Sequence, residues 1–235
     1  MSAQVLILRP EPGATRTAAA AAALGLDPVT APLFHLKAVE WRPPPVWAYD
    51  AVILTSGNAV RLAADGLEQM LDAVCYVVGD STARAALDAG FADVRTGPSD
   101  GAALIELMVA DGVTEALHLC GREHAELSRP PIRIERRVVY ASDAVETLPE
   151  QALEALEAGA LALLHSPRAA ACFAELAEAA GLSKDRICIA AISDSAAQAA
   201  GSGWKGKSVA LEPRDHALLE LAAKLCKTGG VSSGK

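Results

Sequence analysis

The two halves of this 235-residue chain repeat three sequence blocks in the same order. In the first half the blocks are DAVILTSGNAV (50–60), VVGDSTARAALDAG (77–90) and VRTGPSDGAAL (94–104). The corresponding blocks of the second half are ALLHSPRAA (162–170), AISDSAAQAAG (191–201) and VALEPRDHALL (209–219). A solenoid repeat is only about 20–50 residues long, whereas this repeat unit has the size of a domain. The repeat therefore predicts two similar lobes with a cleft between them, a common place for a small-molecule site.

Short apolar runs alternate with helical patterns along the whole chain. Most runs are rich in Val, Ile and Leu and do not alternate with polar residues, as expected of parallel strands covered on both faces. We expect strands at 5–9, 27–31, 51–55, 74–78, 93–96, 116–119, 136–140, 160–165, 187–192 and 208–211. Gly25, Gly90 and Gly201 follow three helical patterns, where a left-handed glycine commonly ends a helix. Strands alternating with helices predict an α/β fold with parallel sheets.

The two predicted lobes are interleaved in the sequence. Residues 116–140 repeat residues 5–31, so the first strand–helix–strand unit belongs with the repeats of the second half. We therefore predict a discontinuous lobe one (1–36 with 143–235), a lobe two (46–137) and two linkers (37–45 and 138–142).

Composition and charge exclude several classes of protein. The formal net charge of −8 argues against nonspecific nucleic-acid binding, and at 4% aromatic residues the chain has few side chains for base stacking. No apolar run is long enough to span a membrane, and the N-terminal segment lacks the pattern of a secretion signal. We expect a cytoplasmic protein. Nothing in the sequence demands a partner subunit, so we also expect a monomer.

Neither metal nor disulfide sites are predicted. The five cysteines are scattered without a CxxC pair, and the five histidines lack HxxxH or HExxH spacing. Motifs of hydrolases, P-loop proteins and dinucleotide-binding proteins are absent. A two-thiol racemase is disfavoured because Cys75 and Cys188 stand at the beginnings of their predicted strands.

Small polar residues and arginines follow the predicted strands. In open parallel sheets, ligands bind beyond the carboxyl ends of the strands, and hydroxyls, arginines and helix N-termini there suit carboxylate or phosphate. Our anion-binding candidates are Arg9, Thr55, Ser56, Asn58, Ser81, Thr82, Arg122, Ser166, Arg168 and Ser195. Helix capping is the commoner role of any single Ser, Thr or Asp at such a place. Ser99, Asp100 and Asp215 are also predicted to cap helices.

Tyr140 ends the predicted strand at 136–140, where the chain returns from lobe two to lobe one. We therefore expect it to face the cleft. A phenol stays protonated at neutral pH and can donate a proton or a hydrogen bond. The alternative is an aromatic side chain that packs on the linker.

These motifs resemble those of the uroporphyrinogen-III synthase family. The matching segments are LRP (8–10), LTSGNAV (54–60), VGDSTA (78–83), VY (139–140) and HSP (165–167), which follow that family's order over almost the whole chain. The resemblance implies two flavodoxin-like lobes joined by a two-stranded β-ladder linker. It also implies that the N-terminal segment completes the C-terminal lobe.

The resemblance implies a reaction as well. In this family, hydroxymethylbilane loses water and closes into uroporphyrinogen III with ring D inverted, a step of haem biosynthesis that needs no metal or organic cofactor. Tyr140 matches the family's tyrosine, the best candidate to assist the loss of water. Ser166, Thr55 and Ser56 match the family's hydroxyls, and Arg9 matches its first-strand arginine.

The sequence departs from the family pattern at two places. SDSA (193–196) replaces a Gly-x-Thr-Thr-like turn, so Ser195 is left to supply the hydroxyl and the side-chain contact expected at Ala196 is lost. GREH (121–124) replaces a longer Arg-Gly-Glu-like segment. The alternative function is a two-lobed protein that binds a small anionic ligand without chemistry, and the altered turn favours it.

Overall fold

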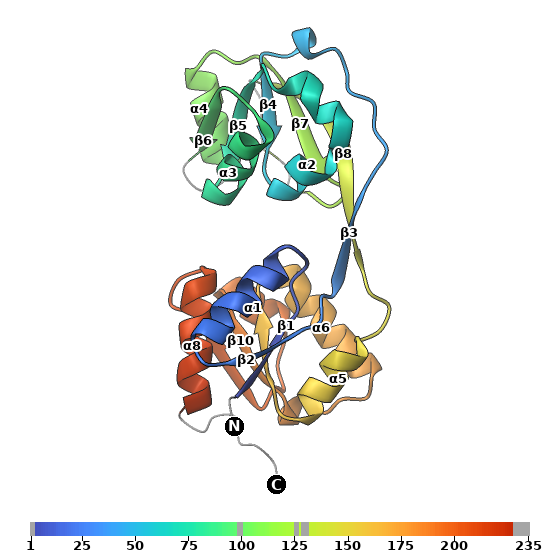
Figure 1. Ribbon diagram of the computed structural model, residues 1–235, viewed down its shortest axis with the longest axis vertical. Helices are drawn as coiled ribbons and strands as arrows, with labels where there is room; N and C mark the ends of the chain where they lie inside the picture. Colours follow the sequence, from blue (N-terminus) through green and yellow to red (C-terminus); the bar gives the residue numbers. More distant parts are fainter. Residues whose placement is uncertain (1–2, 98–100, 125–126, 128–131, 228–235) are drawn as a thin grey trace. The chain divides into compact units, whose positions relative to one another are not determined.

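The structure is a computed structural model that describes residues 3–97, 101–124, 127 and 132–227. Contacts divide the chain into two compact units, Met1–His35 with Ala144–Lys235 (the first unit) and Leu36–Asp143 (the second unit). The colours of Figure 1 show that the first unit combines the N-terminal segment, in blue, with the yellow-to-red C-terminal part. No helix among the described residues is long and apolar enough to cross a membrane.

The first unit is built on a parallel sheet of five strands. Their order is β11 (Gly206–Val209), β10 (Cys188–Ala191), β9 (Leu161–Leu164), β1 (Gln4–Ile7) and β2 (Asp27–Thr30). The N-terminal β1 thus hydrogen-bonds to β9 and β2. Leu6, Leu163 and Ala190 are fully buried because helices cover both faces of the sheet.

Five helices form the outer layers of the first unit. They are α1 (Gly13–Ala23), α5 (Glu150–Glu157), α6 (Pro167–Ala179), α7 (Asp194–Ala199) and α8 (Asp215–Lys227). Side chains of α5, α6 and α7 fill the core on one face of the sheet, and those of α1 and α8 fill the core on the other. Gly25 and Gly201 have φ angles of 78° and 75°, which confirms the predicted left-handed helix ends.

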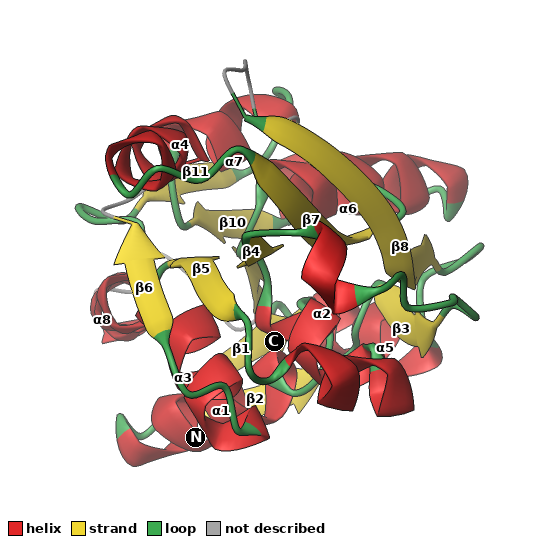
Figure 2. Ribbon diagram, turned by 90° about the horizontal axis from the view of Figure 1, so that it is seen from above, coloured by secondary structure: helices red, strands yellow, loops and turns green. Residues whose placement is uncertain are grey.

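The second unit contains a sheet of six strands. Their order is β3 (Phe34–Ala38), β8 (Arg133–Ala144), β7 (Glu115–Gly121), β4 (Ala51–Leu54), β5 (Val74–Val78) and β6 (Val94–Gly97). The pairs from β8 to β6 are parallel, which confirms the α/β prediction for this unit. β8 runs beside β7 and well beyond the predicted 136–140 (Figure 2).

Three helices cover the second sheet. α2 (Gly57–Leu62) and α3 (Asp80–Ala89) pack on one face, and α4 (Gly101–Ala110) packs on the other. Short 3₁₀ turns lie at Val46–Ala48 and Ala64–Met70, and one in the first unit lies at Lys184–Arg186. The predicted caps Ser99 and Asp100 lie outside the described residues.

Candidate functional site

The first unit presents Ser166 and Arg168 where β9 leads into α6. Ser166 is in extended backbone, and its Oγ accepts a hydrogen bond from the Ala169 backbone N–H at 3.1 Å. Pro167 follows at the first helical position, which needs no donor. The Arg168 guanidinium lies 4.5 Å from the centre of the Phe34 ring, a cation–π contact. Ser166 therefore caps the helix with one lone pair and keeps its O–H for another acceptor.

The altered turn lies where β10 leads into α7. Ser193, not Ser195, caps this helix by accepting from the Ala196 N–H at 3.3 Å. The Ser195 side chain is exposed, and its Oγ lies 3.0 Å from Ser193 Oγ. Ala196 is fully buried in the core below. The turn thus offers the Ser195 hydroxyl and no side-chain donor at position 196.

Arg9 takes part in a polar network that ties β1 to α1 and α8. Its Nη1 donates to Thr17 Oγ1 at 3.1 Å and lies 3.2 Å from Asp215 Oδ1. His165 Nε2 lies 2.9 Å from the same carboxylate oxygen, and the Thr17 hydroxyl donates to it as well. Burial opposes the charge of Asp215, but the hydrogen bonds from His165 and Thr17 and the charge of Arg9 outweigh it and lower the pKa of this carboxyl.

This network corrects one prediction. Asp215 was expected to cap α8, yet it is the first residue of that helix and its carboxylate bonds to side chains of other elements. A carboxylate near a helix N-terminus is favoured by the helix dipole in either arrangement. The observed bonds make Asp215 a structural link to Arg9, whose side chain is 30% exposed.

In the second unit, Ser56 and Asn58 begin α2 beyond β4. Ser56 caps the helix by accepting from the Asn58 N–H at 3.2 Å, and the Asn58 side-chain oxygen accepts from Arg61. Ser56 therefore caps its helix from extended backbone, as Ser166 does in the first unit, although Ser56 accepts from the second residue after it and Ser166 from the third.

Thr55, just before this cap, contacts a buried histidine. Its Oγ1 lies 3.2 Å from Nε2 of His118, a fully buried residue of β7. Burial, with added repulsion from His124 and Arg136, lowers the pKa of His118 from 6.5 to about 4. His118 is therefore neutral at pH 7, and one of its ring nitrogens carries a hydrogen while the other does not.

Ser81 and Thr82 lie within the first turn of α3, after Gly79. Ser81 is exposed, whereas Thr82 is 3% exposed and lies against the core of the second unit. Of these two candidates, Ser81 is therefore placed to meet a ligand and Thr82 is placed to support the helix start.

Arg122 directly follows β7 and is exposed. Its Nη1 lies 3.1 Å from Asp143 Oδ1 on β8, and Asp143 also forms an ion pair with Lys37. Arg122 is thus oriented by a carboxylate on the neighbouring strand.

Tyr140 packs against Gly121 at the carboxyl end of β7. A Cβ atom at Gly121 would lie 2.6 Å from Tyr140 Cζ and 2.9 Å from its hydroxyl oxygen, so only glycine leaves room for the ring. The side chain is 9% exposed, and its hydroxyl makes no hydrogen bond to any described residue. The Tyr140 backbone carbonyl accepts from the Arg122 N–H at 2.9 Å. The structure therefore brings Tyr140 and Arg122 together at one strand end.

A protein-family model for uroporphyrinogen-III synthase HemD matches residues 15–220. The chain belongs to the uroporphyrinogen-III synthase family. Members of this family act in tetrapyrrole biosynthesis. No curated protein matches the sequence.

Solved structures of uroporphyrinogen-III synthases share the fold. The enzyme from Helicobacter pylori is 20% identical with a TM-score of 0.68, over 96% of this chain and 100% of that one. A mutant enzyme from Thermus thermophilus is 19% identical with a TM-score of 0.52, over 97% of this chain and 100% of that one. At these identities the likeness extends to the fold alone.

Sequence reasoning missed two contacts to candidate residues in this uroporphyrinogen-III synthase family member, although Asp215 itself was named as a helix cap. His118 contacts Thr55 because β4 and β7 are neighbouring strands in register. Asp215 contacts Arg9 although the two residues are 206 positions apart in the sequence. The apolar runs 51–55 and 116–119, with five and four residues, carry no signal that would have identified the first pairing. Among the described residues, no cluster of three or more His, Cys, Asp or Glu side chains could hold a metal ion.

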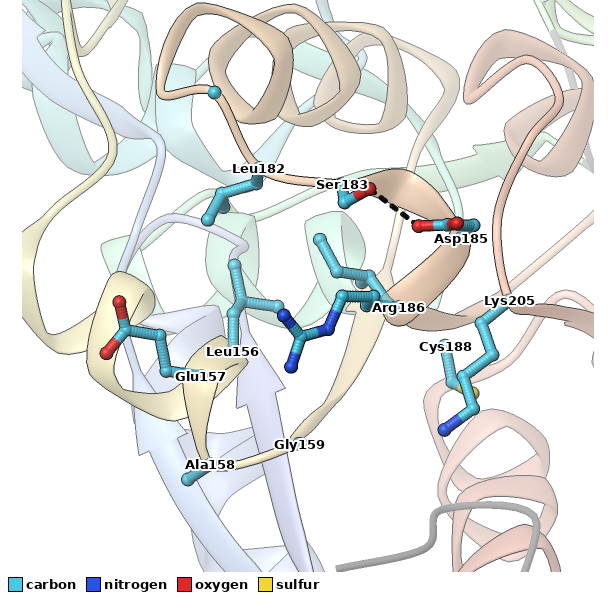
Figure 3. A pocket seen from close by; sticks show the side chains of 12 residues that line it. Leu156, Glu157, Ala158, Gly159, Leu182, Ser183, Asp185, Arg186, Cys188 and Lys205 are labelled. Atoms are coloured by element: carbon cyan, nitrogen blue, oxygen red, sulfur yellow. Dashed lines mark hydrogen bonds between the residues drawn. The ribbon is translucent and has the colours of Figure 1, made fainter. Parts of the chain in front are cut away.

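A cavity of about 690 Å³ in the first unit is not part of the candidate site (Figure 3). It borders Cys188, the first residue of β10, and therefore lies at the amino end of that strand. None of the predicted site residues lines it. Glu157 and Asp185 balance Arg186 and Lys205 on its wall, so its charge does not select an anion.

Proposed function

We propose that the chain converts hydroxymethylbilane to uroporphyrinogen III, with loss of water and inversion of ring D, as a cofactor-independent lyase. The family match over residues 15–220 carries this proposal. The retained Tyr140, with a hydroxyl that is not engaged by any described residue, supports it.

The reaction requires two main contributions from the protein: an acid, and restraint of the substrate conformation. An acid helps the hydroxyl to leave, and a fixed substrate conformation turns ring closure into an oriented intramolecular step. Exclusion of water protects the reactive intermediate. Because unguided closure gives the uninverted isomer, most of the catalytic task is to hold the linear tetrapyrrole in the correct fold.

We assign the acid role to Tyr140. The ring is held on Gly121, and the hydroxyl has no internal acceptor among the described residues, so it is available to the departing hydroxyl. Arg122, which follows Gly121, is proposed to bind a substrate carboxylate near this hydroxyl.

The carboxylates of the substrate are proposed to bind at the carboxyl ends of the strands. Arg168, Ser166 and Ser195 would serve in the first unit, and Ser56, Thr55 and Ser81 in the second. These are neutral hydroxyl donors with few cations, which suits a chain with a net charge of −8.

The test is the isomer of the product. Purified protein is mixed with freshly prepared hydroxymethylbilane, the product is oxidised, and the uroporphyrin isomers are separated by chromatography. We expect the type III isomer in excess. If only type I forms, at the rate of a control without protein, the catalytic proposal is wrong and the binding protein favoured by the Ala196 turn takes its place.

A further inference from the structure

Among the described residues, Thr55 is the hydrogen-bond partner of the His118 ring, and the His124 ring meets it edge-on with centroids 6.1 Å apart. His118 lies in β7 opposite Ile53 of β4, and it points to the α4 face of the sheet because its neighbours Leu117 and Leu119 pack on the other. Thr55 follows Ile53 by two residues and shares that face. The side chains meet at 3.2 Å between His118 Nε2 and Thr55 Oγ1. His118 Nδ1 is buried and has no hydrogen-bond partner among the described residues.

The unpartnered Nδ1 determines which nitrogen carries the hydrogen. If Nδ1 were protonated, a buried N–H donor would be left unpaired, which is rare in folded proteins. An unpaired acceptor is tolerated more often. With the hydrogen on Nε2, the one ring donor is satisfied by Thr55 Oγ1 and only a lone pair is left bare. The Nε2–H form is therefore favoured.

The first unit already uses this arrangement. His165 Nε2 faces the Asp215 carboxylate, which can only accept, so Nε2 must carry the hydrogen. His165 Nδ1 is buried and, within the part of the chain that the structure describes, has no hydrogen-bond partner, just as in His118. His165 follows β9 and Thr55 follows β4, the two strands that the sequence repeat relates. A histidine with a buried, bare Nδ1 thus occurs in both units, and in the first unit it stands at the repeat position of Thr55.

We propose that His118 is a positioning residue that donates from Nε2–H to Thr55 Oγ1 and so turns the Thr55 hydroxyl into a donor toward a carboxylate of the substrate. A hydroxyl that accepts from His118 keeps its own O–H for a third group. A hydroxyl that donated to His118 would present only lone pairs and would repel an anion. The substrate part of this inference rests on the proposed function, whereas the tautomer does not.

The first test reads the tautomer in the wild-type protein. The protein is labelled with ¹⁵N histidine, and long-range ¹H–¹⁵N correlation spectra at pH 7.5 identify which ring nitrogen of each histidine is protonated. The spectrum of His118→Gln assigns the His118 signals by their disappearance. We expect the Nε2–H form of His118. An Nδ1–H form, or fast exchange between the two, would overturn the proposal whatever the protein catalyses.

The second test compares two replacements of His118. The amide nitrogen of Gln can occupy the place of Nε2 and donate to Thr55, whereas Met in His118→Met fills similar space without a donor. We expect His118→Met to raise the KM for hydroxymethylbilane about five- to tenfold, with a smaller change in kcat. This is less than the full loss of one hydrogen bond to a charged group, because Thr55 keeps its hydroxyl. His118→Gln should stay within about twofold of wild type, because it keeps the donor.

The control is the same pair of replacements in a Thr55→Val background. The difference between Gln and Met should vanish there, because Val offers no oxygen to orient. A difference that persists, or equal KM values for the two single variants, would show that His118 does not act through Thr55. If the wild type makes no type III isomer while His118 is in the Nε2–H form, the proposed function fails and the hydrogen-bond assignment stands.

Discussion

Mild acid should destabilise the second unit through His118. Its side chain is fully buried, and burial, helped by the charges of His124 and Arg136, lowers its pKa from 6.5 to about 4. In the unfolded chain it titrates near its ordinary value. Between these values the unfolded state binds a proton that the native state does not, so stability is lost as pH falls from about 6.5 toward 4. Across this whole window the free energy of unfolding falls by about 3 kcal/mol, at a maximum slope of about 1.4 kcal/mol per pH unit.

Urea unfolding at pH 7.5, 6.5 and 5.5 measures this effect. A Trp204→Phe background leaves Trp41 and Trp47 as fluorescent reporters, and both lie in the second unit. We expect the free energy of unfolding to fall by about 1 kcal/mol between pH 6.5 and 5.5, and this fall to be absent in His118→Gln. His216→Gln is the matched control, because that histidine is exposed on α8.

The pH window separates His118 from the carboxylates. Hydrogen bonds from Thr114 and Glu115 N–H groups lower the pKa of Asp50, and one from Tyr49 lowers that of Glu135, so both titrate below the window. Equal pH slopes for His118→Gln and its parent would refute the reasoning. They would mean that the protonated ring is accommodated in the folded state, by water or by local opening.

Three further predictions concern the candidate site. Tyr140→Phe should slow turnover by about 10²-fold without changing the urea midpoint, and unchanged turnover would remove Tyr140 from the mechanism. Gly121→Ala should displace the Tyr140 ring, lowering both turnover and stability, the latter by about 1–3 kcal/mol; wild-type values would contradict the close packing. Asp215→Asn should cost about 2 kcal/mol in urea unfolding, whereas Asp88→Asn in an exposed ion pair should cost under about 0.5; equal losses would refute the network.

The strands that could be predicted are those buried on both faces. β4 and β5 were placed within one residue because Val, Ile and Leu fill positions that helices cover on both sides. β3 was not among the predicted runs. Its sequence FHLKA places His35 and Lys37 on an exposed side and has only one fully buried position, so it lacks an apolar run. The extension of β8 beyond 136–140 was not predicted because the residues that it adds do not form an apolar run: Arg133, Glu135 and Asp143 are charged and not buried, although Ala141 is fully buried.

The sequence predicts which single loops contribute to the candidate site, but it does not predict which side chains contact one another across loops. Ser56 and Ser166 stand before helices, and a local rule is enough to expect a cap there. The partners of Thr55 and Arg9 come from residues 63 and 206 positions away, so no local rule identifies them. They depend on strand order and on which helix end reaches a given loop, and both are settled only by tertiary packing.

Capping and ligand binding were treated as alternatives for these hydroxyls, but the hydrogen bonds make them compatible. Ser56 and Ser166 each accept a backbone N–H, and Thr55 accepts from His118 in the proposed tautomer. Each oxygen has one lone pair engaged by the protein, and each O–H is left to donate. A carboxylate accepts hydrogen bonds and cannot donate them, so the same internal bonds that fix the hydroxyls also select an anionic ligand. An acidic chain can in this way bind a polycarboxylate without a large basic surface.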